Sequence, residues 1–276
     1  MGRRVGQVTR RLRNIPVEDD SAWVFNRMAN DYDARPAYPE ALIDEVTKGA
    51  LASGPRLLDI GAGIGHLALP LAERGLDVLA LEPARLMLER LQLEAARRDV
   101  KLRTLHGTAE ALPFDGPSFD CAVIADALHF LDVERVAEGL RRVLIPGATL
   151  VVITCGLAPT PFMREVQKCI ARSADRRRRD VSHALRRLAS LANFRMSEER
   201  ILHDETELDE ASIERVLRTV SFVGPAMAGA RFEALRAQIA EIPHARAWAR
   251  TFAVRIGRRR PPVFDAASVG GRKYSV

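Results

Sequence analysis

The sequence predicts an α/β protein with a doubly wound, mostly parallel sheet. The main observation is that short apolar segments alternate with amphipathic helical segments across residues 57–153, with short connections between them. A second observation is that some of these segments, such as 121–125, are apolar at nearly every position. Such strands are buried on both faces, as parallel strands between two layers of helices are.

Seven strands are expected, each a short apolar run. They are residues 57–60, 77–82, 100–106, 121–125, 149–153, 201–206 and 251–256. Amphipathic helices are expected at 67–74, 83–95, 133–144, 210–219 and 232–240, and a further helix begins at Pro39, since proline is favoured in a first helical turn. The alternation stops after Gly156, and an inserted helical lid is therefore expected at about 157–200.

The 276 residues suffice for one large domain. We expect a flexible basic tail at 1–20, a single domain at 21–258 and a C-terminal tail at 259–276, because both ends are poor in apolar pattern. No apolar run approaches the roughly 20 residues that cross a bilayer, and the N-terminus lacks the apolar stretch of a secretory signal. We therefore expect no membrane partner.

The composition favours a cytoplasmic protein without a bound metal. The three cysteines show no CxxC spacing, which predicts reduced thiols and neither a disulfide framework nor a zinc site. The net charge is +6, but only four of the 42 basic residues are lysines and aromatic residues make up 5%. We attribute the excess of arginine to coding bias, and expect a monomer or homodimer with no nucleic-acid partner.

The stretch that carries the chemistry is a glycine turn after the first strand. Asp59 lies at the end of that strand, and Gly61, Gly63 and Gly65 follow at alternating positions ahead of a helical pattern. Glycines allow close backbone approach to a ligand and positive φ, and a helix N-terminus offers free N–H groups. Dinucleotides and S-adenosylmethionine (SAM) are the two cofactor classes that bind such turns.

The spacing favours SAM over a dinucleotide. The dinucleotide motif is G-x-G-x-x-G, and His66 stands at the position of its third glycine. A carboxylate such as Asp59 is unfavourable beside a pyrophosphate but suits the ammonium group of an amino acid. Glu82 ends the second strand about 20 residues after the turn, where an acid accepts hydrogen bonds from ribose hydroxyls. Alternatively, Glu82 caps the helix that follows Pro83.

Further motifs extend this pattern in one register. They are residues 57–65, Glu82, 107–114, 118–123, 127–132 and 140–147. With these motifs the chain resembles the class I SAM-dependent methyltransferases of small-molecule type, similar to methyltransferase type 11, over about residues 22–155 and more loosely at the last strand. Ala148 departs from the family, which often has a second glycine there. The resemblance implies a Rossmann-like sheet, SAM as cofactor and S-adenosylhomocysteine as product.

The resemblance also implies the residues of the site. By it, the methionine part of SAM is held by Asp59, Gly61, Ala62, Gly63 and Gly65, the ribose by Glu82, the adenosine by Pro83 and Leu86, the adenine by Thr108, Ala109 and Glu110, and the sulfonium region by Asp126 and Ala127. It places His129 near the transferred methyl group, as a general base or as a packing residue. His183 and His244 are more remote candidates.

Two prolines bracket a loop that carries Tyr32, Arg35 and Tyr38. Because proline fixes φ, this loop is expected to be ordered. Either its aromatic residues attach it to the body of the protein, or it covers a site and contacts the substrate. The sequence leaves both interpretations open.

These observations predict an enzyme that transfers a methyl group from SAM to a small molecule, by O-, N- or C-methylation. Positioning for in-line displacement is expected to supply most of the catalysis. An RNA- or DNA-directed methyltransferase is an alternative, but residues 125–128 lack the Pro-Pro-aromatic motif of amino-methylating nucleic-acid enzymes. The same fold could also belong to a protein without transfer activity, or to an enzyme with a non-methylating activity.

Overall fold

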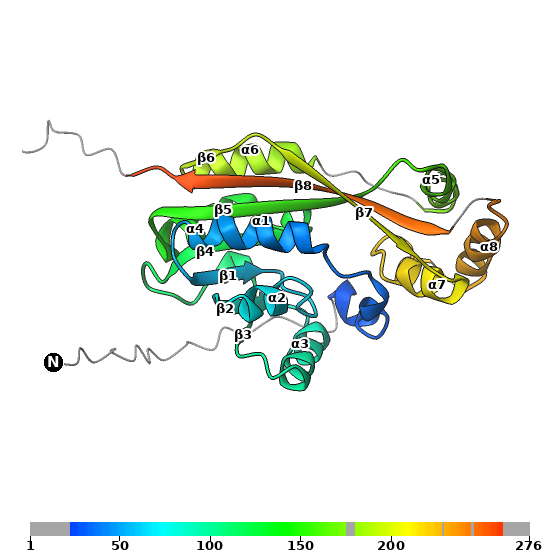
Figure 1. Ribbon diagram of the computed structural model, residues 1–276, viewed down its shortest axis with the longest axis horizontal. Coiled ribbons are helices and arrows are strands. Elements are labelled where there is room, and N and C mark those ends of the chain that lie inside the picture. The colour runs from blue at the N-terminus through cyan, green and yellow to red at the C-terminus, as the bar shows by residue number, and fades with distance from the viewer. Residues whose placement is uncertain (1–22, 175–179, 228, 244–245, 262–276) are drawn as a thin grey trace, which may run out of the picture.

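The computed structural model describes residues 23–174, 180–227, 229–243 and 246–261 (Figure 1). The predicted tail at 1–20, most of the tail predicted at 259–276, and His244 lie outside the described residues. In the described part the chain forms a mixed α/β structure with helices on both sides of one sheet.

The sheet has eight strands in the part of the chain that is described. They are β1 (Arg56–Ile60), β2 (Asp77–Glu82), β3 (Arg103–His106), β4 (Phe119–Ala125), β5 (Leu144–Leu157), β6 (Phe194–Met196), β7 (Arg200–Glu207) and β8 (Ala247–Arg259). Their order is β3-β2-β1-β4-β5-β8-β6, with β7 also paired to β8. Strands β1 to β5 are parallel, and β8 is antiparallel to β5, β6 and β7. The mostly parallel, doubly wound sheet is therefore confirmed.

The predicted number of seven strands is wrong by one. The additional strand is β6, whose three residues are too few to show a strand periodicity in the sequence. It forms because β8 is 13 residues long, so that one end of β8 pairs with β6 and the other with β7. Strand β5 is likewise longer than its predicted core, and it pairs with β8 from Thr149 to Leu157.

Helices cover the sheet on both faces. They are α1 (Glu40–Leu51), α2 (Ala68–Glu73), α3 (Arg85–Arg97), α4 (Val133–Val143) and α6 (Val181–Leu191). Side chains of β1 alternate between two cores: Leu58 and Ile60 pack with α4 and α6, whereas Leu57 packs with α1 and α2. By this alternation Asp59 belongs to the same face as Leu57, in the middle of the sheet.

A separate group of helices lies beyond one end of the sheet, and we call it the helical cap (Figure 1). It comprises α5 (Pro161–Ser173), α7 (Glu210–Arg218) and α8 (Gly229–Ala240), whose apolar side chains form one core with Trp248 of β8. The predicted lid at 157–200 therefore has the wrong boundaries. Its second helix, α6, packs Leu185 and Leu188 into the main core beside α4, while α7 and α8 belong to the cap.

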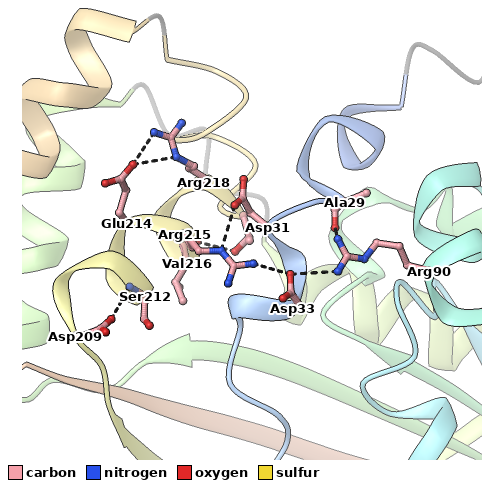
Figure 2. A network of polar contacts seen from close by, with 11 residues as sticks. Ala29, Asp31, Asp33, Arg90, Asp209, Ser212, Glu214, Arg215, Val216 and Arg218 are labelled. Carbon is pink, nitrogen blue, oxygen red and sulfur yellow. Dashed lines mark hydrogen bonds and ion pairs between the residues drawn. The ribbon is translucent and has the colours of Figure 1, made fainter. Parts of the chain in front are cut away.

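Residues 23–38 join the cap to the body of the protein. Two short 3₁₀ helices, η2 (Val24–Met28) and η3 (Tyr32–Ala34), lie in this segment. Asp33 binds Arg215 of α7 at 2.8 Å and Arg90 of α3 at 3.3 Å, so one carboxylate links cap and body (Figure 2). Arg90 also donates to the Ala29 carbonyl at 2.7 Å. We call these contacts the Asp33 bridge.

We predict that Arg215→Gln loosens this attachment with little effect on global stability. Exposed ion pairs contribute only about 0.2–1 kcal/mol each, and salt screens them. Hydrogen exchange of the amides at 26–35 is expected to accelerate at low ionic strength, with a smaller effect at high salt. Arg218→Gln is the matched control, because Arg218 pairs with Glu214 of its own helix (Figure 2). Equal acceleration in both variants would show that the bridge does not hold the segment.

Candidate active site

A cavity of about 500 Å³ opens at the carboxyl ends of the central parallel strands. In an open α/β sheet this is the edge at which ligands bind. Nearly all predicted site residues line it: Tyr32, Arg35, Tyr38, Asp59, Gly61, Ala62, Gly63, Glu82, Pro83, Thr108, Ala109, Glu110, Asp126, Ala127 and His129. Three predicted residues do not line it, namely Gly65, the partly exposed Leu86 and His183 of α6.

The glycine turn has the backbone that its sequence requires. Gly61, Gly63 and Gly65 have φ values of +74°, +58° and +90°. A Cβ on Gly61 would lie 2.9 Å from the Ala127 Cβ, and one on Gly65 would lie 2.9 Å from Leu91 of α3. Gly65 thus allows close packing between turn and helix. A Cβ on Gly63 would meet only Tyr32, at 3.8 Å, so Gly63 presents bare backbone to the cavity.

Asp59 is a buried carboxyl group with an unsatisfied oxygen. The residue is 1% exposed, and among the described residues its Oδ2 is the one buried side-chain oxygen or nitrogen that has no hydrogen-bond partner. Burial, and secondarily the charge of Glu82, raise the pKa of Asp59 to about 7. A buried carboxylate without a donor is costly, and Asp59 lines the cavity. The arrangement therefore suits a ligand that brings a cationic or N–H donor.

Glu82 supports the glycine turn from the end of β2. Its Oε2 accepts a hydrogen bond from the Gly63 N–H at 2.8 Å, and its Oε1 accepts one from the Ala84 N–H at 2.9 Å. Burial raises the pKa of Glu82 to about 7, although these two hydrogen bonds act in the opposite direction. The bond to Ala84, which precedes α3, agrees with the capping interpretation. The carboxylate also lines the cavity, as the ribose interpretation requires.

The end of β4 has an unusual backbone. Asp126 has a φ of +50°, which is uncommon for a residue other than glycine and costs on the order of 1 kcal/mol. Its N–H donates to the Ile153 carbonyl at 2.8 Å, which fixes the turn beside Ala127. The Asp126 carboxylate lies 3.9 Å from the Arg35 guanidinium. Strained positions of this kind cluster at functional sites.

The residues expected at the adenine have mixed surroundings. Ala109 and Glu110 belong to the 3₁₀ helix η4 (Ala109–Ala111), and Thr108 precedes it. The Glu110 carboxylate already accepts the N–H of Asp132 at 3.0 Å, ahead of α4. Because this oxygen of Glu110 is already occupied, a ligand in this part of the cavity would mainly contact Thr108, Ala109 and the backbone.

The loop with Tyr32, Arg35 and Tyr38 is attached to the body and also lines the cavity. Tyr32 stacks on His66 with ring centroids 5.9 Å apart, and Tyr38 packs edge-on against Phe252 at 5.6 Å. Burial raises the pKa of both tyrosines, that of Tyr38 most strongly, so both hydroxyls stay protonated at neutral pH. The structure thus fits both interpretations of the loop.

Arg250 of β8 holds the same loop from the other side. It is 6% exposed and binds Asp204 of β7, and it donates to the carbonyls of Pro36 at 2.7 Å and Ala37 at 2.6 Å. Four of the five N–H groups of this guanidinium thus donate to acceptors. The position of the loop over the cavity therefore depends on a residue more than 200 positions further along the chain.

His129 lies on the cavity wall within the 3₁₀ helix η5 (Leu128–Phe130). Its ring contacts that of Phe130, with centroids 4.0 Å apart. Both the catalytic and the packing interpretation of His129 remain consistent with this position. His66 was not predicted as a site residue, yet it lines the cavity. Burial, with Arg35 nearby, lowers the pKa of His66 to about 4, so its ring is neutral.

Most of the apolar walls of the cavity were not predicted from the sequence. Both tryptophans of the chain, Trp23 and Trp248, line the cavity, together with Phe25, Phe130 and Phe222. The available signal was weak, because an aromatic residue in an apolar pattern indicates burial without indicating which cavity it faces. Across the described ranges, no cluster of three or more His, Cys, Asp or Glu side chains is arranged to hold a metal, and no helix could cross a membrane.

Comparison with known proteins supports the resemblance to the methyltransferases. Residues 58–152 match the family model of a methyltransferase domain. The resemblance to class I SAM-dependent methyltransferases that the motifs show is therefore confirmed over this segment. The fold of the chain is shared with the YcgJ protein of Bacillus subtilis, at a TM-score of 0.57 and 20% identity over 80% of this chain and 99% of that one.

Two curated relatives show how far the similarity extends. An uncharacterised methyltransferase of Mycobacterium tuberculosis is 35% identical over 158 residues, which are 56% of this chain and 62% of the relative. The demethylmenaquinone methyltransferase of Thermus thermophilus is 41% identical over 108 residues, which are 38% of this chain and 49% of the relative. The chain thus spans less than two thirds of either relative.

We predict that Asp59→Asn changes stability and cofactor binding in opposite directions. The pKa of Asp59 is about 7 in the folded state and about 4 when unfolded, so the folded state binds its proton more tightly between these values. The ligand-free protein therefore loses stability as the pH rises from 4 to 7, and Asp59→Asn is expected to lose less. Thermal unfolding between pH 5 and 8 measures the difference.

The same variant is expected to bind S-adenosylhomocysteine at least about tenfold more weakly at pH 8, because a hydrogen bond to a charged group is lost. Asp120→Asn serves as the control. Asp120 is a buried carboxylate that accepts hydrogen bonds from the Arg56 side chain at 2.6 and 3.0 Å, outside the cavity. It should lower stability and leave the affinity unchanged. A destabilised Asp59→Asn with normal affinity would refute the assignment.

Proposed function

We propose that the protein transfers a methyl group from SAM to a small-molecule acceptor. The observation that carries this proposal is the unsatisfied, buried Asp59 carboxylate beside a glycine turn with bare backbone at Gly63. An amino-acid ammonium group is the complement of that carboxylate, and a pyrophosphate is not. Among nucleotide-like cofactors, SAM carries such an ammonium group.

The chain's residues offer SAM a set of contacts in the order of its parts. Asp59 and the backbone of Gly61, Ala62 and Gly63 would hold the methionine part. Glu82 would accept hydrogen bonds from the ribose while it keeps the Gly63 N–H. Pro83, Thr108, Ala109 and Glu110 would border the adenosine, and Asp126 with Ala127 would lie nearest the sulfonium.

When bound, SAM supplies an electrophilic methyl group, so that the acceptor's lone pair forms a new bond as the carbon–sulfur bond breaks and its electron pair stays on sulfur. The protein mainly positions the acceptor for this displacement. The cap and the loop at Tyr32–Tyr38 would exclude water from the cavity. His129 would take a proton only from an acceptor that carries a hydroxyl group or an acidic carbon. With three free cysteines, the protein is expected to work in the cytoplasm.

Calorimetric titration tests the proposal at its first step. The folded protein is expected to bind SAM and S-adenosylhomocysteine with micromolar dissociation constants and to show no comparable binding of NAD. With methyl-labelled SAM and a cell extract, label is expected in the small-molecule fraction and not in total RNA. Absence of SAM binding to folded protein would refute both methyltransferase hypotheses, and label in RNA would favour a nucleic-acid acceptor.

A further inference from the structure

The cavity extends beyond the residues assigned to SAM. Its second part is lined by apolar side chains from the end of β5, from the cap and from β8. They are Leu157, Ile170, Val216, Val220, Phe222 and Trp248. The cofactor assignments use none of them. We call this part the cap half, and all six of these residues lie outside the segment 58–152 matched by the methyltransferase-domain model.

The two parts of the cavity differ in charge. All four carboxylates that line the cavity, Asp59, Glu82, Glu110 and Asp126, belong to the part assigned to SAM. The guanidinium groups on its wall, in the described residues, are those of Arg35 and Arg250. An acidic part suits the positive charges of SAM. Because Asp204 pairs with Arg250, Arg35 is the cation on this wall, among the described residues, that favours a second ligand of opposite charge.

Of these two arginines, Arg35 has a donor to offer. Its Nε donates to the Thr219 hydroxyl at 2.9 Å, and its Nη2 donates to the Thr219 carbonyl at 2.8 Å. These bonds fix the guanidinium against the end of α7. Its Nη1 lies 3.9 Å from the Asp126 carboxylate, which is longer than a hydrogen bond. Arg250, by contrast, is satisfied by Asp204 and by two loop carbonyls.

Arg35 therefore lies at the junction of the two halves. Thr219 directly precedes Val220 of the cap half, while Asp126 belongs to the part assigned to SAM. A guanidinium held rigidly by two hydrogen bonds loses little entropy on binding a further oxygen. An anionic oxygen placed there would be adjacent to the region proposed for methyl transfer.

The walls of the cap half select the rest of the ligand. Trp248 is 4% exposed and packs in the cap core, and Phe222 lies on the same wall. Aromatic side chains bind planar rings well through stacked or edge-on contacts. The polar side chains on this wall are few, chiefly Gln167 and Ser221, and Gln167 already donates to the Leu157 carbonyl at 3.3 Å.

We propose that the cap half binds the methyl acceptor, and that this acceptor is a planar, largely apolar molecule with one anionic oxygen group, which Arg35 receives. The identification as an acceptor rests on the proposed function. The existence of the subsite and its preference for a planar anion do not rest on that function, because they follow from the cavity walls and from Arg35.

A matched pair of probes tests the preference. 4-Nitrobenzoate and 4-nitrobenzamide share one planar ring, differ in charge, and both quench tryptophan fluorescence. The chain has two tryptophans, so Trp23→Phe leaves Trp248 as the reporter of the cap half. We expect 4-nitrobenzoate to quench Trp248 with an affinity at least about tenfold higher than that of the amide, since a hydrogen bond from a guanidinium to a carboxylate is charge-assisted. Octanoate, an anion without a ring, should bind more weakly than 4-nitrobenzoate.

Two arginine variants locate the charge. Arg35→Gln is expected to reduce the preference for 4-nitrobenzoate to about threefold or less. Arg90→Gln is the matched control, because Arg90 contacts the same N-terminal segment but does not line the cavity. It should keep the full preference. If Arg35→Gln does not fold, the ratio of the two affinities in the protein with Arg35 still decides whether the cap half prefers an anion.

Several results would overturn the proposal. Equal affinities for 4-nitrobenzoate and 4-nitrobenzamide would exclude an anion subsite, and an unchanged preference in Arg35→Gln would exclude Arg35. Quenching in Trp248→Phe but not in Trp23→Phe would place the probe outside the cap half. Titration with S-adenosylhomocysteine is run separately. If it fails while Trp248 responds, the subsite stands and the proposed methyl transfer falls.

Discussion

The structure depends on one uncompensated charge in the middle of its sheet. Asp59 lies in β1, between β2 and β4, with Ala80 and Val123 as its register partners. Water does not reach it, and its Oδ2 has no donor among the described residues. Such a group lowers the stability of the ligand-free protein and raises the affinity for any ligand that supplies a hydrogen-bond donor. The glycine turn leaves bare backbone beside this group at Gly63, where a Cβ would meet only Tyr32 at 3.8 Å.

Around this carboxylate, two different contacts hold the segment 23–38. The inner one is buried: Arg250 binds Asp204 and the carbonyls of Pro36 and Ala37. The outer one is the Asp33 bridge, which lies on the surface and is weak. The buried contact can fix the loop over the cavity, and Arg35 holds the same segment to Thr219 at the end of α7.

Local sequence patterns were sufficient to predict much of this structure. The alternation of apolar strands and helices predicted the parallel sheet, and the glycine spacing with Asp59 and Glu82 predicted a ligand site at the edge where the cavity opens. These features depend on residues that are close in sequence. By contrast, the extra strand β6 exists because β8 is long enough to pair with both β6 and β7. The cap boundaries depend on whether a helix faces α4 or Trp248, which amphipathicity alone does not reveal.

The site shows the same division between local and long-range information. Motifs predicted the residues on the side assigned to SAM, but not Trp248 or Arg250, which reach the cavity through contacts between distant segments. Glu82 contacts both the turn and the residue before α3 and also lines the cavity, so its ribose and capping interpretations both stay predictions.

The central claim is that the Asp59 carboxylate receives the ammonium group of SAM, and its pKa tests this most directly. Carbon-13 NMR of labelled aspartate, assigned with Asp59→Asn, measures the pKa with and without S-adenosylhomocysteine. Bound ammonium stabilises the charged carboxylate, so the pKa is expected to fall from about 7 to about 5 or lower. A pKa that stays at about 7 or rises in the complex would contradict the claim.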